Sequence, residues 1–554
     1  MRKRTIQKSW VLGIAIFVMG GCGLAYEYTF SKIASDLLGN SVRQWAVVIA
    51  LMLFCMGVGA EVQRLITQKR ALLALLLSQV LLSLLGGFGP ILSLIAFAHY
   101  PYHFSLIHYG LISMIGVLIG FEIPLITRLN EEFSQDIRSN LATILKMDYI
   151  GALVGALGWV FILPKFFTLH ETAYVLGGLS LLTALLCWIC FRANLLCSKR
   201  VLFAILSSAG LLLWGGTHSH KWSIHTEQSL YLDQVIHSVT TPYQHIVLTK
   251  GKSGTLRCYI NGHIQFSATD EYIYHEHLVH PAMAIAGHKK RVLILGGGDG
   301  LAVREVLKYP EVSEIVLVDL DPQMTDLART HPSLTKLNNY ALTNQRVNYI
   351  ANQAVSPGSA YALETVKQRR LRRRQEITSG PDLHVMNLDA SSYIHQAKGR
   401  FDVIILDFPD PSSPELAKLY SSAFYSALKL HLAADGIIVQ QSTSPFQAKE
   451  AFLCIGRTLE SSGFAVAPTH DHVPSFGEWG WWFATHKEFL SSEGLTKQLR
   501  SITALPQETQ YLTVDLIQAS TYFGKGTLES TETDITTLLD TAVLSHYTKG
   551  WTNE

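Results

Sequence analysis

Long apolar segments fill the first 216 residues of this chain and place the strongest constraint on its fold. From Trp10 to about Gly216, apolar runs follow one another, each close to the ~20 residues with which an α-helix crosses a bilayer. The third run holds Gly86-Gly87-Phe88-Gly89-Pro90, so a broken or re-entrant pair is an alternative there. We expect about seven spans, with six or eight as alternatives, near 10–30, 43–62, 71–98, 105–127, 141–164, 171–193 and 200–216.

Composition separates this region from the rest of the chain. The 554 residues are 48% hydrophobic and 16% charged, which is too apolar for an ordinary soluble enzyme, yet beyond about residue 220 the composition is that of a soluble domain. A net charge of +2 does not indicate a nucleic-acid partner. The seven cysteines are scattered and odd in number, so they predict no disulfide framework.

Basic residues predict how the spans are oriented. A basic N-terminus also fits a signal peptide, and Met19-Gly20-Gly21-Cys22 hints at lipoprotein cleavage, but the apolar run continues to Ala34 and favours an uncleaved span. Cations cluster in alternate loops, so we expect the N-terminus in the cytoplasm of a cell (inner) membrane. They are Arg2, Lys3, Arg4, Lys8, Arg64, Lys69, Arg70, Arg128, Arg138, Arg192, Lys199 and Arg200. Seven spans would put the soluble half outside the cytoplasm, whereas its chemistry favours the cytoplasm. An error of one in the number of spans would reverse the predicted side.

Four carboxylates lie within or beside the expected spans: Glu27, Glu61, Glu122 and Asp148. Charges at such depth are costly and usually face a bundle interior or a partner. Helix–helix hydrogen bonding is the simpler interpretation, and a cation-accepting groove is the alternative.

The soluble half begins with β-strands and continues with alternating strands and helices. After a linker at 217–226, strands are expected at 243–248 and 256–260, and Asn261-Gly262 predicts a hairpin turn. From Arg291 the alternation predicts a doubly wound parallel sheet. The expected domains are a helical membrane bundle (1–220), a small β domain (221–285), an α/β domain (286–490, with an arginine-rich insertion at 356–381) and a tail (491–554).

A glycine turn carries the first chemical signal. Leu293 to Gly300 reads as an apolar strand that ends in Gly-Gly-Gly-Asp-Gly, where glycines let the backbone approach a nucleoside. The carboxylate of Asp299 would repel a phosphate and attract a cationic ligand. The next strand ends at Asp319, the position that commonly binds ribose hydroxyls.

A second signal is the strand Phe401 to Leu406, which delivers Asp407 to the carboxyl edge of the sheet, with Asp410 three residues later. Two carboxylates placed in this way can hold a diamine: one deprotonates the attacking nitrogen and the other binds the far ammonium. A plain turn is the alternative explanation of Asp-Phe-Pro-Asp-Pro.

Together these segments resemble the spermidine synthase family, polyamine aminopropyltransferases on a methyltransferase-like Rossmann fold. The bacterial branch with an N-terminal multi-span membrane domain is the most similar. The resemblance spans roughly Leu230 to Thr485, and Tyr26-Glu27 and Asp148 to Leu153 are similar to the membrane segment of that branch. It rests on Tyr243-Gln244, Asn261 to Gln265, Asp270-Glu271, Tyr274-His275-Glu276, Gly296 to Gly300, Asp319, Asp389 and Asp407 to Pro411.

The resemblance implies the reaction and the partners. Decarboxylated S-adenosylmethionine is the aminopropyl donor and co-substrate, an amine such as putrescine is the acceptor, and no cofactor is tightly bound. Soluble relatives imply a dimer or tetramer as one arrangement, and the lipid bilayer is a further partner. A methyltransferase, or a membrane polyamine transporter or sensor with a non-catalytic synthase-like half, remains as an alternative.

The resemblance also implies a role for each site residue. Asp407 is the base, Asp410 binds the remote charge of the acceptor, and Gln265 lies near the acceptor. Tyr274 and His275 line the cleft. Gln244 and Asp299 hold the donor, Asp319 its ribose and Asp389 its adenine end.

Departures from the family pattern concern the acceptor side. Ser412-Ser413-Pro414 replaces the usual Gly-Pro-Ala, and Phe476 stands where many soluble members place a tyrosine against the reacting amine. His275, His277 and His280 lack a suitable set of partner ligands, so no metal is expected.

Overall fold

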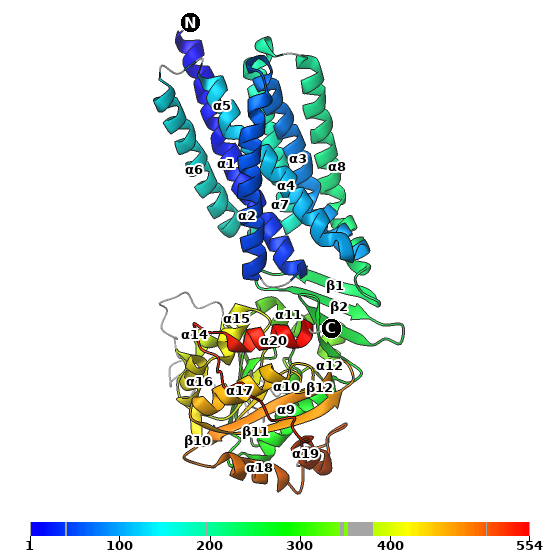
Figure 1. The fold of residues 1–554 in the computed structure, drawn as a ribbon. Helices are drawn as coiled ribbons and strands as arrows, with labels where there is room; N and C mark the ends of the chain where they lie inside the picture. Colours follow the sequence, from blue (N-terminus) through cyan, green and yellow to red (C-terminus); the bar gives the residue numbers. More distant parts are fainter. Residues whose placement is uncertain are drawn as a thin grey trace, which may run out of the picture. The chain divides into compact units, whose positions relative to one another are not determined.

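A computed structural model describes residues 2–38, 41–131, 133, 136–195, 197–343, 348–352, 381–505 and 507–552. The contacts within it divide the chain into two compact units, Met1–Gln234 and Val235–Glu554. Figure 1 shows long helices in the first unit and a mixed α/β arrangement in the second. The arginine-rich insertion expected at 356–381 lies, up to residue 380, outside the described residues.

The first unit is helical. Among the described residues, seven helical stretches are long and apolar enough to cross a membrane, the fourth being Pro101–Asn130, which contains both α4 and α5. Its α-helices are α1 (Arg2–Leu38), α2 (Ser41–Val62), α3 (Gln68–His99), α4 (Phe104–Gly120), α5 (Glu122–Asn130), α6 (Ile137–Phe161), α7 (Leu169–Phe191) and α8 (Ser198–Gln228). Short 3₁₀ turns join several of them: η1 (Gln63–Leu65), η2 (Pro101–His103), η3 (Leu163–Lys165) and η4 (Arg192–Asn194).

The alternative of a broken or re-entrant pair does not hold, and one expectation for this unit is wrong. Helix α3 runs without a break through Pro90, and the glycines beside it pack on aromatic rings of α1. A Cβ atom on Gly86 would lie 2.3 Å from the Tyr26 ring. The expected linker at 217–226 is part of α8, where Trp214, His218 and Trp222 follow one another at helical spacing and their rings are 5.0 to 6.1 Å apart.

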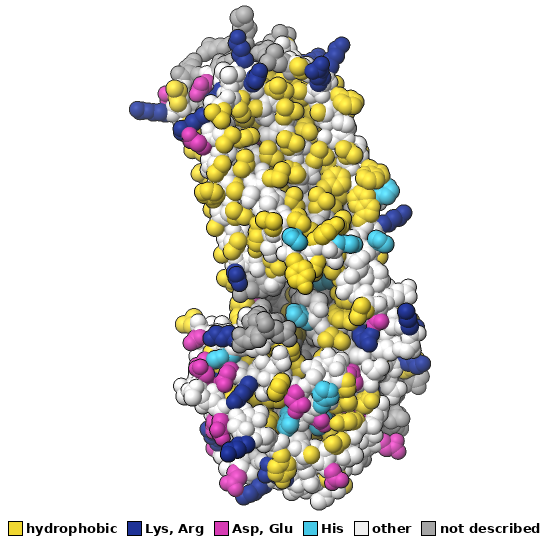
Figure 2. Space-filling model, turned by 45° about the vertical axis from the view of Figure 1, so that its right-hand side comes forward, with side chains coloured by type: hydrophobic (Ala, Val, Ile, Leu, Met, Phe, Trp, Pro, Cys, Tyr) yellow, Lys and Arg dark blue, Asp and Glu magenta, His cyan; other side chains and the backbone are white. Residues whose placement is uncertain are grey.

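Basic side chains gather at one end of the helical unit, and hydrophobic side chains cover the visible face along its length (Figure 2). Contacts join the segments that meet at this end. Lys8 lies 5.3 Å from the centroid of the Phe191 ring, and Arg128 bonds the carbonyl of Ile66 at 2.9 Å. The start of α1, the α2–α3 connection and the ends of α5 and α7 therefore share one basic end.

The second unit starts with a four-stranded sheet in the order β1-β2-β3-β4. The hairpin turn expected at Asn261-Gly262 is present, and both residues have the positive φ that such a turn needs, 50° and 82°. The strands are β1 (Gln234–Thr240), β2 (His245–Lys250), β3 (Leu256–Ile260) and β4 (His263–Ser267). Helix α9 (Glu271–Ile285) follows, and although its first turns are rich in polar residues, it is almost wholly buried.

An eight-stranded sheet forms the centre of this unit, in the order β11-β12-β10-β9-β5-β6-β8-β7. Pairing is parallel from β10 to β7, and β12 and β11 are antiparallel. The strands are β5 (Arg291–Gly296), β6 (Glu314–Asp319), β7 (Asn348–Asn352), β8 (Asp382–Asn387), β9 (Phe401–Asp407), β10 (Leu432–Gln441), β11 (Phe464–Val473) and β12 (Gly477–His486).

Helices cover both faces of this sheet, because neighbouring residues of a strand enter two different cores. Val292 and Ile294 belong to one core, and Leu293 and Leu295 to the other. The helical segments after α9 are α10 (Leu301–Val306), α11 (Pro322–Thr330), α12 (Pro332–Leu337), α14 (Ala390–Ile394), α15 (Pro414–Ala417), η5 (Lys418–Tyr420), α16 (Ser422–Lys429), α17 (Lys449–Ser461), α18 (Ser492–Arg500), α19 (Val514–Ser520) and α20 (Ala542–Thr552). Leu495 of α18 and Val543 of α20 are buried in these cores, so the tail packs on this unit.

Candidate active site

The glycine turn joins the ends of two central strands. Gly296 and Gly297 have φ values of 86° and 65°, a backbone region that favours glycine. Gly296 pairs with Asp407 across β5 and β9, and a Cβ atom on Gly296 would lie 2.0 Å from the Asp407 carbonyl oxygen. The turn therefore packs directly on the residue predicted to be the catalytic base.

Asp319 is fixed at the end of β6 by two backbone donors. Its Oδ2 accepts a hydrogen bond from the N–H of Gly298 and its Oδ1 from that of Asp321, each at 2.9 Å. A Cβ atom on Gly298 would lie 2.5 Å from the Asp319 carboxyl carbon, so glycine is required there. Burial raises the pKa of Asp319 to about 7 although both N–H groups favour the charged form.

Asp407 receives a hydrogen bond from helix α9. The Tyr274 hydroxyl donates to Asp407 Oδ1 at 2.6 Å, and the Tyr274 ring packs against Phe476 with centroids 6.0 Å apart. Burial raises the pKa of Asp407, against the lowering effects of His275 and of the Tyr274 hydrogen bond. A carboxylate with a raised pKa is a better proton acceptor, as the role of base requires.

A buried ion-pair network lies beside these two residues. His275 Nδ1 is 2.8 Å from Glu271 Oε2, and Arg304 binds the same carboxylate through Nη1 at 2.7 Å and Nη2 at 3.0 Å. Burial lowers the pKa of His275, but Glu271 outweighs burial and raises it to about 9. His275 is thus a buried cation whose Nδ1 is already bonded, and it acts on Asp299 and Asp407 through its charge.

Asp299 is affected by the positive charge of His275. Its Oδ1 accepts from the N–H of Leu301 at 2.8 Å, and Asn338 bonds its backbone carbonyl at 2.9 Å. Burial raises the pKa of Asp299 to about 6, while His275 lowers it. At neutral pH the carboxylate is therefore mostly ionised and can bind a cation.

Asp410 is held by three donors, none of which the sequence had indicated. Gln441 Nε2 lies 3.3 Å from Oδ1, Thr443 Oγ1 lies 3.2 Å from Oδ2, and the Tyr547 hydroxyl of α20 also donates to this carboxylate. Burial raises the pKa of Asp410 and the three donors lower it, so that the pKa lies at about 6. Thr443 has φ 57°, a strained conformation for a β-branched residue and one that is concentrated at functional sites.

Among the described residues, three other predicted site residues make no hydrogen bond with these carboxylates. Gln265 Nε2 bonds the carbonyl of His263 in its own strand at 3.2 Å, and the backbone N–H of Gln244 bonds Thr241. Asp389 caps α14 and pairs with Lys418 at 2.9 Å. Burial raises the pKa of Asp389, but Lys418 and the N–H of Ser392 outweigh burial and lower it.

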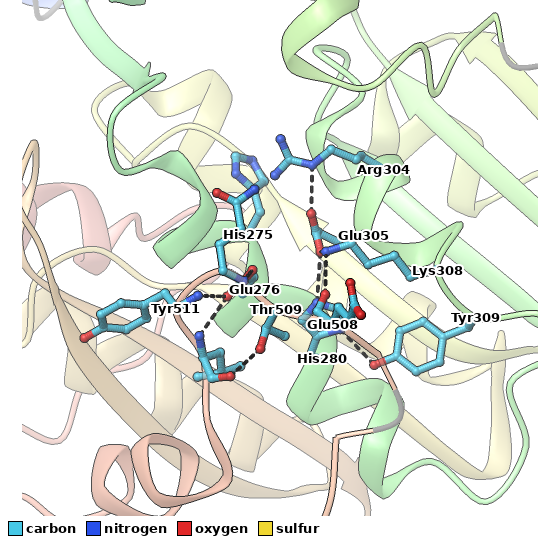
Figure 3. A network of polar contacts seen from close by, with 12 residues as sticks. His275, Glu276, His280, Arg304, Glu305, Lys308, Tyr309, Glu508, Thr509 and Tyr511 are labelled. Atoms are coloured by element: carbon cyan, nitrogen blue, oxygen red, sulfur yellow. Dashed lines mark hydrogen bonds and ion pairs between the residues drawn. The ribbon is translucent and has the colours of Figure 1, made fainter.

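A group of possible metal ligands, Glu276, His280 and Glu305, lies in the same unit (Figure 3). Glu276 accepts from the backbone N–H groups of Gln510, Tyr511 and Leu512 at 2.6, 3.0 and 2.8 Å. Glu305 pairs with His280, Arg304 and Lys308. The network already holds its own cations, so its donor set fits an anchor for the tail better than a metal site.

The three histidines that the sequence places close together, His275, His277 and His280, each bind a different carboxylate. His275 binds Glu271, and His280 binds Glu305 at 2.9 Å. His277 binds Asp471 at 2.8 Å and stacks on Trp481.

Comparison with known proteins identifies the family to which the chain is similar. A family model described as "Spermine/spermidine synthase domain" matches residues 271–357 and 362–493. "Polyamine aminopropyltransferase 2" of Ralstonia nicotianae is 38% identical over 476 residues, 85% of this chain and 86% of that protein. "Polyamine aminopropyltransferase" of Leptospira interrogans is 35% identical over 91% of this chain and 95% of its own. A solved spermidine synthase in complex with the transition state analogue AdoDATO is 22% identical, covers 53% of this chain and 88% of that one, and has a TM-score of 0.41.

The family model and the similar aminopropyltransferases define an enzyme of the transferase class. The chain belongs to the polyamine aminopropyltransferase family, as its sequence resemblance had indicated. The family assignment favours this activity over that of a methyltransferase.

Proposed function

We propose that the chain transfers the aminopropyl group of decarboxylated S-adenosylmethionine to an amine such as putrescine, giving spermidine and 5′-methylthioadenosine. The observation that carries the proposal is the group of partly buried carboxylates at one edge of the sheet. Asp319, Asp299, Asp407 and Asp410 stand at or just after the ends of β6, β5 and β9. Such an anionic edge suits a donor and an acceptor that are both cations.

Each carboxylate has a distinct task in this proposal. Asp319 binds the ribose hydroxyls of the donor, and Asp299 binds its aminopropyl ammonium. Asp389 binds its adenine end, and Gln244 also contacts the donor. Asp410 binds the remote ammonium of the acceptor, and Gln265 lies on the acceptor side. Tyr274 orients Asp407, and the His275 charge limits the mutual repulsion of Asp299 and Asp407.

The reaction is a displacement at carbon. The neutral acceptor nitrogen attacks the carbon bonded to the sulfonium, a C–N bond forms, and the C–S electron pair leaves on sulfur as a neutral thioether. The nitrogen loses one proton to Asp407, which passes it to solvent. A free amine has a pKa near ~10, comparable to that of lysine, so supplying the nucleophile unprotonated is the main chemical task of the protein.

Product analysis tests the proposal. Detergent-solubilised full-length protein, given decarboxylated S-adenosylmethionine and putrescine, is expected to form spermidine and methylthioadenosine in equal amounts by mass spectrometry. A panel of diamines and monoamines identifies the acceptor class. Turnover with ordinary S-adenosylmethionine, or no product with any amine, would refute it, and putrescine uptake into liposomes tests transport separately.

We further propose that the helical unit anchors the enzyme in a membrane with its basic end in the cytoplasm. Large apolar side chains are exposed along the helices, and the basic residues share one end. An odd number of crossings, such as the seven candidate helices, would leave the catalytic unit, which follows α8 directly, on the opposite side. The chemistry of the substrates favours the cytoplasm for that unit instead, and this placement requires that one of the candidate helices does not cross. Among the exposed apolar residues are Leu53, Phe54, Phe203 and Leu213.

Cysteine labelling decides the side. Native Cys197 is exposed at the basic end, between α7 and α8, and Ser253 is exposed in the β2–β3 loop of the catalytic unit. In intact cells a membrane-impermeant maleimide is expected to spare Cys197 and to label a Cys197→Ser, Ser253→Cys variant. The reverse pattern would invert the orientation, and protection of both positions would show that one helix does not cross.

A further inference from the structure

We infer that the C-terminal helix α20 completes the acceptor half of the active site, with Tyr547 as a positioning residue for Asp410. The inference rests on the proposed function, because it assigns Asp410 to the remote ammonium of the acceptor. Tyr547 lies beyond the segment that matches the family model, which ends at residue 493.

The segment before α20 is attached firmly to the sheet unit. Thr536 is fully buried, and its backbone N–H bonds Thr458 Oγ1 at 3.0 Å while its carbonyl accepts from the N–H of Ser422 at 2.8 Å. Asp534 pairs with Arg457 at 2.9 Å and with His546 at 2.7 Å. His546 immediately precedes Tyr547, so these contacts fix the start of the helix and the approach of the tyrosine.

Close packing fixes the position of the C-terminal end of α20. A Cβ atom on Gly550 would lie 2.8 Å from the Ala448 Cα atom, so helix and loop meet backbone to backbone. That loop continues from Gln441 and Thr443, the other two donors to Asp410. Tyr547, one turn before Gly550, donates its hydroxyl to the same carboxylate.

These contacts explain why an enzyme would use its tail here. An ionised carboxylate offers about four lone-pair sites, and three donors from two separate segments fix its plane while leaving capacity for an ammonium. Hydrogen bonds to a charged group are stronger than neutral ones. Phe476, whose ring packs against that of Tyr274, carries no hydroxyl, and Tyr547 of α20 adds a phenol beside Asp410.

The test compares Tyr547→Phe with Ser545→Ala, which removes an exposed hydroxyl from the same helix. Tyr547→Phe is expected to raise KM for putrescine about tenfold, with donor KM and kcat within about twofold. A monoamine lacks the ammonium that Asp410 binds, so its KM is expected to be unchanged. Ser545→Ala is expected to match the wild type with both amines.

Three results would overturn the inference: an unchanged diamine KM, an equal rise for diamine and monoamine, or a fall in kcat alone. If Tyr547→Phe does not fold, Asp534→Asn is the second variant. It loosens the start of α20 and is expected to raise the diamine KM with the same selectivity. If the wild type forms no product, the proposed function fails. Calorimetric binding of putrescine to wild type and Tyr547→Phe then tests the assignment by itself.

Discussion

Replacing Asp407 by asparagine is expected to lower kcat by about a thousandfold, within the range of general acid–base catalysis, while donor binding stays within about twofold. Asparagine keeps the shape of the side chain and can still contact Tyr274, but it cannot take the proton of the attacking amine. The raised pKa of Asp407, caused mainly by burial, is what makes the native carboxylate an effective acceptor. Single-turnover kinetics with saturating amine, together with calorimetric donor binding, measures the two effects separately.

Two further variants serve as comparisons for Asp407→Asn. Tyr274→Phe removes only the 2.6 Å hydrogen bond to Asp407 and is expected to cost about tenfold, because the base remains. Asp326→Asn changes an exposed carboxylate in α11 and is expected to behave as the wild type. Full activity of Asp407→Asn would remove this residue from the chemistry, and a loss of donor binding as well would show that it serves the fold of the glycine turn.

Local sequence signals predicted the strand ends of the site because each is carried by a short segment. The glycine turn, Asp319 and Asp407 follow apolar strands, and a parallel sheet brings such carboxyl ends to one edge whatever lies between them. The Asn261-Gly262 turn was predictable for the same reason, because two adjacent residues determine the backbone.

Long-range contacts could not be predicted in this way. Helix α9 looks like a polar surface helix, yet Glu276 and His280 are buried because their partners come from the tail and from α10. Tyr547 lies 137 positions after Asp410 along the chain, in a region without a recognisable motif. The polar run Gln441-Ser442-Thr443, directly after an apolar strand, was the one local signal that could have indicated further donors to Asp410.

Asp299→Asn is expected to raise the KM for decarboxylated S-adenosylmethionine about 30- to 100-fold and to weaken the discrimination against ordinary S-adenosylmethionine by a similar factor. The carboxylate attracts the donor's ammonium and repels the carboxylate of the ordinary cofactor. Its loss therefore affects the two compounds in opposite directions. Donor KM and the inhibition constant of S-adenosylmethionine, measured side by side, give the ratio.

Asp389→Asn is the matched comparison, because the proposal places this carboxylate at the adenine end, which both compounds share. It is expected to weaken both equally and to leave their ratio unchanged. Acid should reproduce the Asp299 effect in the wild type: burial raises the pKa of Asp299 to about 6, so the charged form is lost as the pH falls through that value. Donor KM should then rise more steeply below about pH 6 in the wild type than in Asp299→Asn. Parallel profiles would show that Asp299 does not contact the donor's charge, and the anionic turn would then need another explanation.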